Sequence, residues 1–201
     1  MPTLALDTSS ALSVAVVDGD DVLASQTRYA PRGHAELLAP MIRAVLADAD
    51  VAAPDLIVVG TGPAPFTGLR VGLVTARTLG LAWGVPVVGV CSLDALGAAH
   101  GGSVTVVADA RRKEVYWARY EDGVRVAGPA VAVPGDVHVS GGVVGRGATL
   151  YPEVFGDTPP ESSWDPDPSW LTRVAAAQPH VAVDPPEPLY LRRPDVHGVS
   201  S

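Results

Sequence analysis

A short run of polar residues follows the first apolar segment of the chain. The segment from Thr3 to Asp7 reads as a strand that ends in an acid, and Thr8, Ser9 and Ser10 come directly after it. A carboxylate at such a point can hold a metal-bound phosphate or a water, and the hydroxyls and amides beside it can contact phosphate oxygens. The same residue types also close tight turns by hydrogen-bonding to nearby backbone. The residues alone leave both interpretations open.

A glycine- and proline-rich stretch, Gly60 to Gly68, is the second candidate for chemistry. Its glycines, Gly62 among them, and its prolines fix the shape of the loop. Thr67 can cap the helix predicted after it, and the free amides of a helix N-terminus suit an anion. No Gly-Lys-Ser/Thr sequence follows, so the stretch is not a Walker A loop. A rigid turn between a strand and a helix explains the same residues equally well.

Metal and thiol chemistry find little support in the sequence. His34 is the first histidine of the chain and begins a predicted helix, but position 38, where a second ligand would stand, is leucine. Cys91 lies at a strand end, and nothing ties it to His100. We therefore expect no metal site, and we expect Cys91 to be a small buried residue.

The charge balance argues against a chain that binds nucleic acid alone. The net charge is -8, with 14 basic residues among 201, and the longest basic run is Arg111-Arg112-Lys113. A nucleic-acid binder needs a basic patch that displaces phosphate counterions. Any nucleic-acid role is therefore expected to act through a partner.

Several features indicate a cytoplasmic protein without a membrane span. Cys91 is the one cysteine, so no disulfide can form within the chain, which fits a reducing compartment. The chain shows no signal-peptide pattern at its start. The apolar stretch from Val71 to Val90 contains Arg77 and is broken at Gly84-Val85-Pro86, so it predicts a helix followed by a buried strand.

The elements of the first half occur in a recognisable order. Three close strands suggest an antiparallel meander, and two later apolar runs are typical of parallel strands covered on both faces. The predicted elements are strands at 3–7, 12–17 and 22–29, a helix at 34–49, a strand at 56–60, a helix at 68–84 and a strand at 85–90. This β-β-β-α-β-α-β order is that of the ribonuclease-H-like core found in each half of actin-like (ASKHA) folds.

The second half resembles a shortened copy of the first. A strand ending in Asp109 corresponds to the strand ending in Asp7, at an offset of about one hundred residues. The predicted strands are 104–109, 114–120, 124–133 and 137–144, and a helix capped by Ser169 is predicted over 169–177. We therefore predict an α/β fold of two duplicated domains, 1–100 and 101–201, with the second one truncated.

The helix predicted over 68–84 has a small residue at every fourth position. These residues are Gly68, Gly72, Ala76, Gly80 and Gly84. Each interior glycine costs roughly 1 kcal/mol relative to alanine, so close packing must offset it. The helix is apolar nearly all round, which predicts burial on more than one side. Either the helix at 34–49 or a second subunit provides the other cover, and we expect the subunit.

These segments together resemble one family, TsaB/YeaZ. The matching motifs are Leu4 to Ser9, Arg32 to Leu38, Gly62 to Gly72, Asp109 to Trp117 and Pro188 to Arg192. The resemblance implies a non-catalytic subunit of the bacterial complex that makes threonylcarbamoyladenosine in tRNA. It also implies pairing with the transferase TsaD, joined by the ATPase TsaE, and homodimers when TsaD is absent. Contact with tRNA would come only through the complex.

The same resemblance implies where the partner and ligands bind. The pairing bundle would use the two helices at 34–49 and 68–84, through residues His34, Leu37, Leu38, Met41, Ile42, Val45, Arg70, Val71, Gly72, Thr75, Ala76, Leu79 and Gly80. An actin-like cleft, if it binds phosphate, would use Asp7, Thr8, Ser9, Gly62, Thr67, Gly68 and Asp109. No cofactor is expected to bind tightly, and ATP or ADP with magnesium is expected only at the interface of the full complex.

Departures from the catalytic paralogue define the rival functions. The paralogue carries two metal-binding histidines one helical turn apart, whereas this chain has His34 followed by Leu38. The family is also labelled glycoprotease-like, but no residues here support peptidase chemistry. One alternative is an independent actin-like kinase or hydrolase that uses Asp7 and Asp109. A metallopeptidase, which would hold zinc or iron, is the other.

Overall fold

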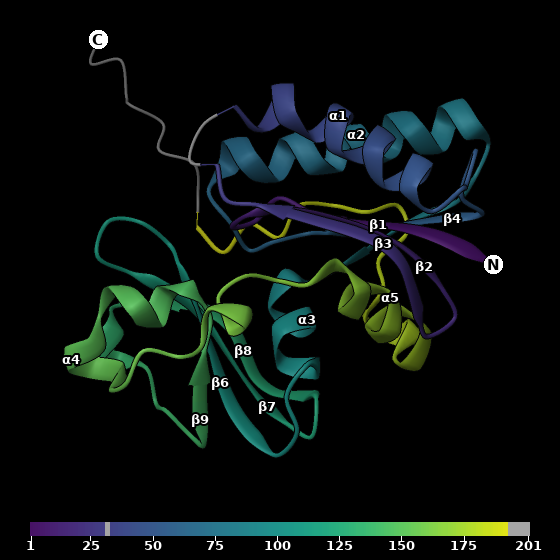
Figure 1. The fold of residues 1–201 in the computed structure, drawn as a ribbon. Helices are drawn as coiled ribbons and strands as arrows, with labels where there is room; N and C mark the ends of the chain where they lie inside the picture. Colours follow the sequence, from purple (N-terminus) through teal and green to yellow (C-terminus); the bar gives the residue numbers. More distant parts are fainter. Residues whose placement is uncertain (31–32, 193–201) are drawn as a thin grey trace, which may run out of the picture.

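The computed structural model describes residues 1–30 and 33–192, and it contains two mixed β-sheets. The first sheet has the strand order β3-β2-β1-β4-β5 (Figure 1). Its strands are β1 (Pro2–Asp7), β2 (Leu12–Asp18), β3 (Asp21–Arg28), β4 (Leu56–Gly60) and β5 (Val87–Val90). The first three form an antiparallel meander and β4 and β5 run parallel to β1, which confirms the predicted order.

Helices α1 (His34–Asp48) and α2 (Phe66–Trp83) lie side by side on one face of this sheet (Figure 1). The apolar stripe of α1 is buried there, and Leu38 and Val45 are each 1% exposed. Burying one such side chain contributes about 1.5–3 kcal/mol. They pack with Leu69 and Leu73 of α2 and with inward residues of the strands. The periodic stripe in the sequence therefore predicts the covered face correctly.

Helices α3 (Ser92–Ala98) and α5 (Pro168–Ala177) cover the other face of the first sheet. Leu171 and Val174 of α5 pack against Val58 and Val90 of the sheet. Cover on both faces explains why β4 and β5 are continuous apolar runs. The sequence did not predict α3, which is a single seven-residue segment. It lies between the two sheets, where Gly97 allows the ring of Tyr120 to approach.

The second sheet has the order β8-β7-β6-β9. Its strands are β6 (Ser103–Asp109), β7 (Val115–Glu121), β8 (Val124–Ala132) and β9 (Gly142–Val144). The prediction of a strand over 137–144 is wrong for most of its length. Ser140 instead exchanges hydrogen bonds with the Thr105 hydroxyl, at 2.9 and 3.0 Å. Gly141 turns the chain with φ +70°, so pairing starts only at Gly142.

Helix starts differ from the predictions in two places. Helix α2 begins at Phe66, so its N-cap is Pro65 and Thr67 lies inside the first turn without capping it. Helix α5 begins at Pro168, and the carboxylate of Asp167 accepts from the Ser169 amide at 2.9 Å. Asp167 is therefore the cap in place of Ser169. The remaining helical pieces are short: η1 (Pro134–Asp136), η2 (Arg146–Leu150), α4 (Pro152–Phe155), η3 (Glu161–Ser163) and η4 (Pro179–Val181).

The end of the described chain runs back over the first sheet and on to the second (Figure 1). Val183 exchanges two backbone hydrogen bonds of 2.8 Å with Gly89, and the Leu189 amide donates to Thr61 O at 2.8 Å. Arg192 then pairs with Glu114 beside β7. Because α5 and this segment lie on the first sheet, the division into 1–100 and 101–201 stays a prediction. Arg32 of the second family motif lies outside the described residues.

Within residues 1–30 and 33–192, no helix has the length and apolar character needed to cross a membrane.

Candidate cleft and helix surface

The carboxylate of Asp7 is fully buried at the end of β1. Its Oδ1 accepts from the amide and the hydroxyl of Ser9, at 2.7 and 2.5 Å, and its Oδ2 accepts from the hydroxyl of Ser92 at 2.5 Å. Burial raises the pKa of Asp7, although the hydrogen bonds from Ser9 and Ser92 oppose this shift. The Asp7 carboxylate thus binds groups of its own chain, as the turn-capping interpretation predicts.

The glycine-rich stretch is shaped by its contact with Asp7. A Cβ on Gly60 would lie 1.8 Å from the Asp7 Oδ2, so a side chain cannot stand there. The Gly62 amide donates to the Ser92 hydroxyl at 3.1 Å, and Ser92 in turn donates to Asp7. These contacts join the ends of β1, β4 and the start of α3, so the stretch works here as a rigid turn.

A cavity of about 480 Å³ opens beside this turn. It is lined by Thr8, Ser9, Ser10, Tyr29, Thr67, Gly68, Arg111 and the first turn of α1 from Gly33 to Glu36. Residues of both first turns line this cavity, and no side chain caps the amides of either turn. Such amides suit an anion. The cavity volume of about 480 Å³ is that of an ordinary small-molecule site.

The predicted phosphate residues fall into three groups. Thr8, Ser9, Thr67 and Gly68 line the 480 Å³ cavity together, whereas Asp7 and Gly62 do not line it. Asp109 lines a smaller cavity of about 50 Å³, which shares Ser9 with the larger one. Its Oδ1 accepts from the Arg111 amide at 2.7 Å, as Asp7 Oδ1 accepts from the Ser9 amide. The two acids therefore make the same local turn in each half, which supports the inferred duplication.

Two features of this region could not be predicted from the sequence. The turn from Arg111 to Lys113 has three successive residues with positive φ, at 59°, 56° and 60°. Arg146 and Asp165 bridge the two halves of the chain, and Asp165 binds Ser10, which is 155 positions away. Contacts of such long separation have no local pattern that a sequence could display.

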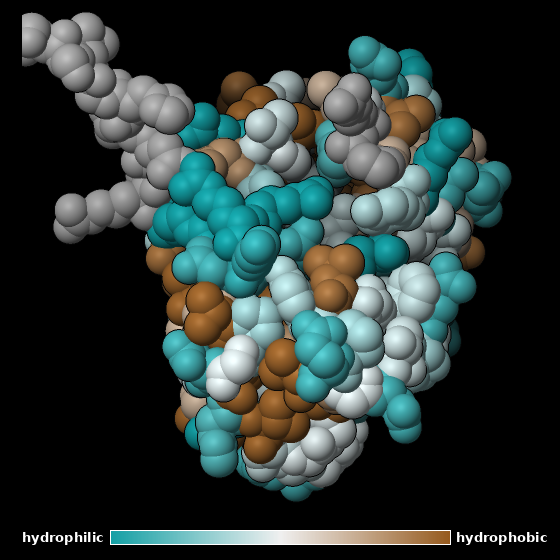
Figure 2. Space-filling view, turned by 90° about the vertical axis from the view of Figure 1, so that its left-hand side faces the viewer, coloured by the Kyte–Doolittle hydropathy of each residue, from teal (hydrophilic) through white to brown (hydrophobic). Residues whose placement is uncertain are grey.

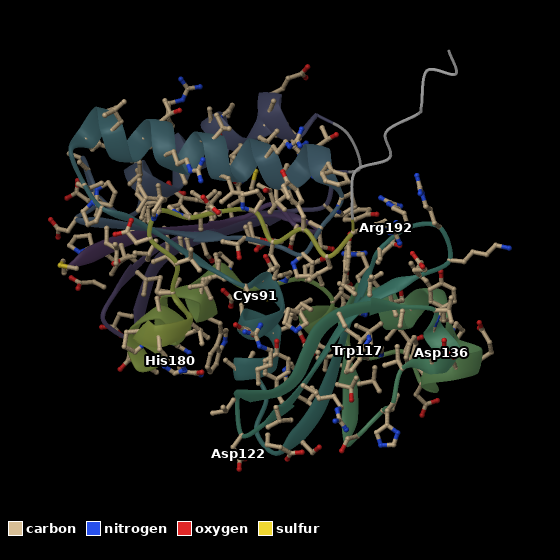
Figure 3. All side chains as sticks on the ribbon, turned by 180° about the vertical axis from the view of Figure 1, so that it is seen from behind. Cys91, Trp117, Asp122, Asp136, His180 and Arg192 are labelled. Atoms are coloured by element: carbon tan, nitrogen blue, oxygen red, sulfur yellow. The ribbon has the colours of Figure 1, made fainter. Side chains whose placement is uncertain are left out.

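Burial affects both His34 and Cys91, the residues considered for metal and thiol chemistry. Burial lowers the pKa of His34, and Leu38 is enclosed in the core. Among the described residues, no group of three or more His, Cys, Asp or Glu side chains could hold a metal ion. Cys91 lies in the interior between the two sheets, as Figure 3 shows, and burial raises the pKa of its thiol to about 12. The expectation of a small buried cysteine is confirmed.

The small residues of α2 do not form an outward ridge, and this prediction is corrected. A Cβ on Gly72 would lie 2.4 Å from Thr8 Oγ1, and one on Gly80 would lie 2.2 Å from Val87 Cγ2. Ala76 is also fully buried. The row therefore faces the chain's own first sheet. Leu38, Met41, Ile42 and Val45 of the predicted interface are likewise buried within the chain.

The outer surface of α2 carries a different stripe. Arg70, Val74, Thr78 and Leu81 are exposed at intervals of three or four residues, with Val74 at 60% and Leu81 at 87%. From the side where α4 lies, Figure 2 shows hydrophilic side chains gathered between apolar patches. Of the predicted interface residues, those that remain exposed or half-buried are His34, Leu37, Arg70, Val71, Thr75 and Leu79.

Comparison with known proteins agrees with this architecture. A family described as "TsaD: tRNA N6-adenosine threonylcarbamoyltransferase" matches residues 21–145. The solved structure of YeaZ from Pseudomonas aeruginosa superposes with a TM-score of 0.81 and 32% identity, over 94% of this chain and 99% of that one. The chain belongs to the TsaB/YeaZ family. The predicted fold class, actin-like with duplicated ribonuclease-H-like units, is thereby confirmed.

Relatives of the TsaB/YeaZ chain differ in length. An uncharacterised protein of Mycobacterium leprae is 45% identical over 207 residues, which cover 98% of this chain and 56% of that protein. The chain thus spans about half the length of that relative. The tRNA threonylcarbamoyladenosine biosynthesis protein TsaB of Bacillus subtilis is 38% identical over 128 residues, or 60% of this chain and 56% of the relative.

Proposed function

We propose that this chain is a non-catalytic scaffold subunit in the biosynthesis of threonylcarbamoyladenosine in tRNA, and that it activates a TsaD-type transferase by pairing with it. Membership of the TsaB/YeaZ family supports the pathway, because relatives in that family are named for it. The site supports a role without catalysis. The Asp7 carboxylate is buried and fully engaged by Ser9 and Ser92.

The outer stripe of α2 is the surface that carries the proposed pairing. Exposed Val74 and Leu81 stand on one helical face, and exposed large apolar side chains in a row are typical of a helix that packs on another helix. The half-buried Val71 and Leu79 extend the apolar surface toward α1. The buried row of Gly72, Ala76 and Gly80 contributes indirectly, since it lets α2 lie close on the sheet.

The rest of the assembly is part of the same proposal. TsaE joins the pair, tRNA is contacted only through the complex in the cytoplasm, and ATP or ADP with magnesium binds only at the interface of the full complex. When the transferase is absent, the same stripe pairs two copies of this chain. A metallopeptidase is not proposed, because Leu38 stands in the core where the second histidine ligand would be.

Co-expression with the TsaD paralogue tests the proposal. Val74→Glu and Leu81→Glu are expected to abolish co-purification, because each places a charge in the apolar contact. Val126→Glu is the matched control, since Val126 is a similarly exposed valine, at 54%, on β8 in the other half of the chain. Undiminished co-purification of both α2 variants would contradict the interface, and failure of the wild-type chain to co-purify would contradict the partner.

The rival kinase or hydrolase is tested on the chain alone. That function needs Asp7 or Asp109 at a bound phosphate, but Asp7 does not line the 480 Å³ cavity and Asp109 pairs with Arg111 at 3.1 Å. Calorimetry with ATP and magnesium is expected to show no turnover. Tight binding with turnover by the isolated chain would favour the rival.

A further inference from the structure

The carboxylate of Asp165 is held by residues from both halves of the chain. Its Oδ1 accepts from the hydroxyl of Ser10, which follows β1, and from Arg146 Nε at 2.9 Å. The Arg146 NH2 group donates to its Oδ2. A guanidinium that meets both oxygens of an acid in this way uses the geometry by which arginine recognises carboxylates and phosphates.

Arg146 is held in place by contacts within the chain. Its guanidinium carbon lies 4.1 Å from the centre of the Tyr29 ring and 5.1 Å from that of Trp164. Its backbone amide donates to Trp164 O at 2.8 Å. The side chains of Arg146 and Asp165 are 20% and 13% exposed, so solvent screens the pair only weakly. A rigid, largely desolvated cation of this kind binds an anion strongly.

The contact between Asp165, Ser10 and Arg146 lies beside the two cavities described above. Ser10 and Tyr29 line the 480 Å³ cavity, and both also line the 50 Å³ cavity that Arg146 reaches. Asp165 is close enough to Asp7 for its charge to raise the pKa of that buried acid. The fold thus brings a second carboxylate, that of Asp165, close to the end of β1, where the carboxylate of Asp7 is already buried.

We propose that Ser10 and Arg146 form an anion-binding subsite, and that the chain's own Asp165 occupies it in place of a phosphate group. Asp165 joins the two halves of the chain as a bound anion would. An external phosphate would compete with Asp165 for the guanidinium of Arg146. This inference concerns the chain alone and does not depend on the proposed pairing with a transferase.

Removing the internal acid tests the proposal on the full chain. Pyrophosphate and ATP are titrated separately by calorimetry without magnesium into the wild type, Asp165→Ala and Asp165→Asn. Pyrophosphate alone detects the phosphate subsite, and tighter binding of ATP would show that the neighbouring cavity takes the nucleoside. Asp157→Ala is the charge-matched control, because Asp157 is an exposed acid on the same connecting segment. Thermal melting establishes that each variant is folded.

Asp165→Ala is expected to bind pyrophosphate at least about tenfold more tightly than the wild type, since a competing charge is gone and Arg146 is free. Asp157→Ala is expected to match the wild type, and Asp165→Ala combined with Arg146→Gln to lose the gain. Asp165→Asn, which keeps the side-chain shape, should show the same direction. Folded Asp165 variants that bind pyrophosphate no better than Asp157→Ala would overturn the proposal.

Discussion

The Oγ1 of Thr8 occupies the space that a side chain at Gly72 would need. A Cβ on residue 72 would lie 2.4 Å from that oxygen, and the Thr8 hydroxyl donates to Gly68 O at 2.9 Å. This contact joins the turn after β1 to the first turns of α2. The absence of a side chain at residue 72 thus sets how closely α2 lies on the sheet, and it also positions the hydroxyls that line the cleft.

We therefore predict that Gly72→Ala destabilises the isolated chain. The added methyl group must displace Thr8, and such overpacking typically costs about 1–3 kcal/mol. The free energy of unfolding, measured with urea, should fall by this amount. Gly101→Ala is the control, because nothing lies within 4 Å of a Cβ at that residue.

A second substitution checks the cause. Thr8→Ala removes the obstructing oxygen, so adding it to Gly72→Ala should cost less than the sum of the two single changes. Additive costs would show that Thr8 is not what limits residue 72. The larger change Gly72→Leu should unfold the monomer, because its longer side chain would meet Thr8 in the same place.

Leu81→Glu should behave in the opposite way. Leu81 is 87% exposed, so the isolated chain loses little packing, and its free energy of unfolding should stay within about 0.5 kcal/mol of the wild type. Its association should be lost. Sedimentation of the chain alone is expected to show a wild-type homodimer and a Leu81→Glu monomer. A variant dimer of unchanged strength would assign the homodimer to another surface.

The buried acid of α3 gives a third prediction. The hydroxyl of Tyr120 donates to Asp94 at 2.7 Å, and Arg125 lies 3.1 Å from the same carboxylate. Tyr120→Phe removes one hydrogen bond to a buried charge, which typically costs about 1.5–3 kcal/mol. Urea unfolding measures the loss. Tyr190→Phe is the comparison, because Tyr190 is 39% exposed and should change stability less.

Asp7 predicts a pH dependence with a defined sign. Burial raises the pKa of Asp7 in the folded chain above the ordinary 3.8. At a pH between the ordinary pKa and the raised pKa, the folded chain therefore keeps a proton on Asp7 that the unfolded chain releases. The Asp7 contribution to stability therefore falls as pH rises through this window. Relative to Asp7→Asn, the wild type should gain stability as pH is lowered from neutral to 4. A difference that is constant with pH would contradict the assigned burial cost.

Cys91 should resist alkylation while the chain is folded. With a thiol pKa of about 12, only about one molecule in ten thousand carries a thiolate at pH 8. Mass spectrometry after iodoacetamide treatment should find the folded protein unmodified and the urea-unfolded protein modified. Rapid modification of the folded chain would show that Cys91 is accessible.

The sequence predicts most of the elements because their signals are local. Strand β4 was predicted with its observed bounds, and the stripe of α1 identified the buried face, since apolar periodicity reports which side of an element is covered. Apolar periodicity gives a wrong strand where a side chain takes the place of a backbone partner in the hydrogen bonds of the sheet. Thr105 binds Ser140 there, and the predicted strand over 137–144 shrinks to β9.

The sequence by itself determined the family motifs, the order of the strands and helices, and the fact that one face of α2 must meet a close neighbour. Only the tertiary structure decided which neighbour that is. A row of small residues records that something packs tightly, but not whether Thr8 and Val87 or another subunit does so. The bridge from Ser10 through Asp165 to Arg146 was equally invisible, because its members meet only when the chain has folded.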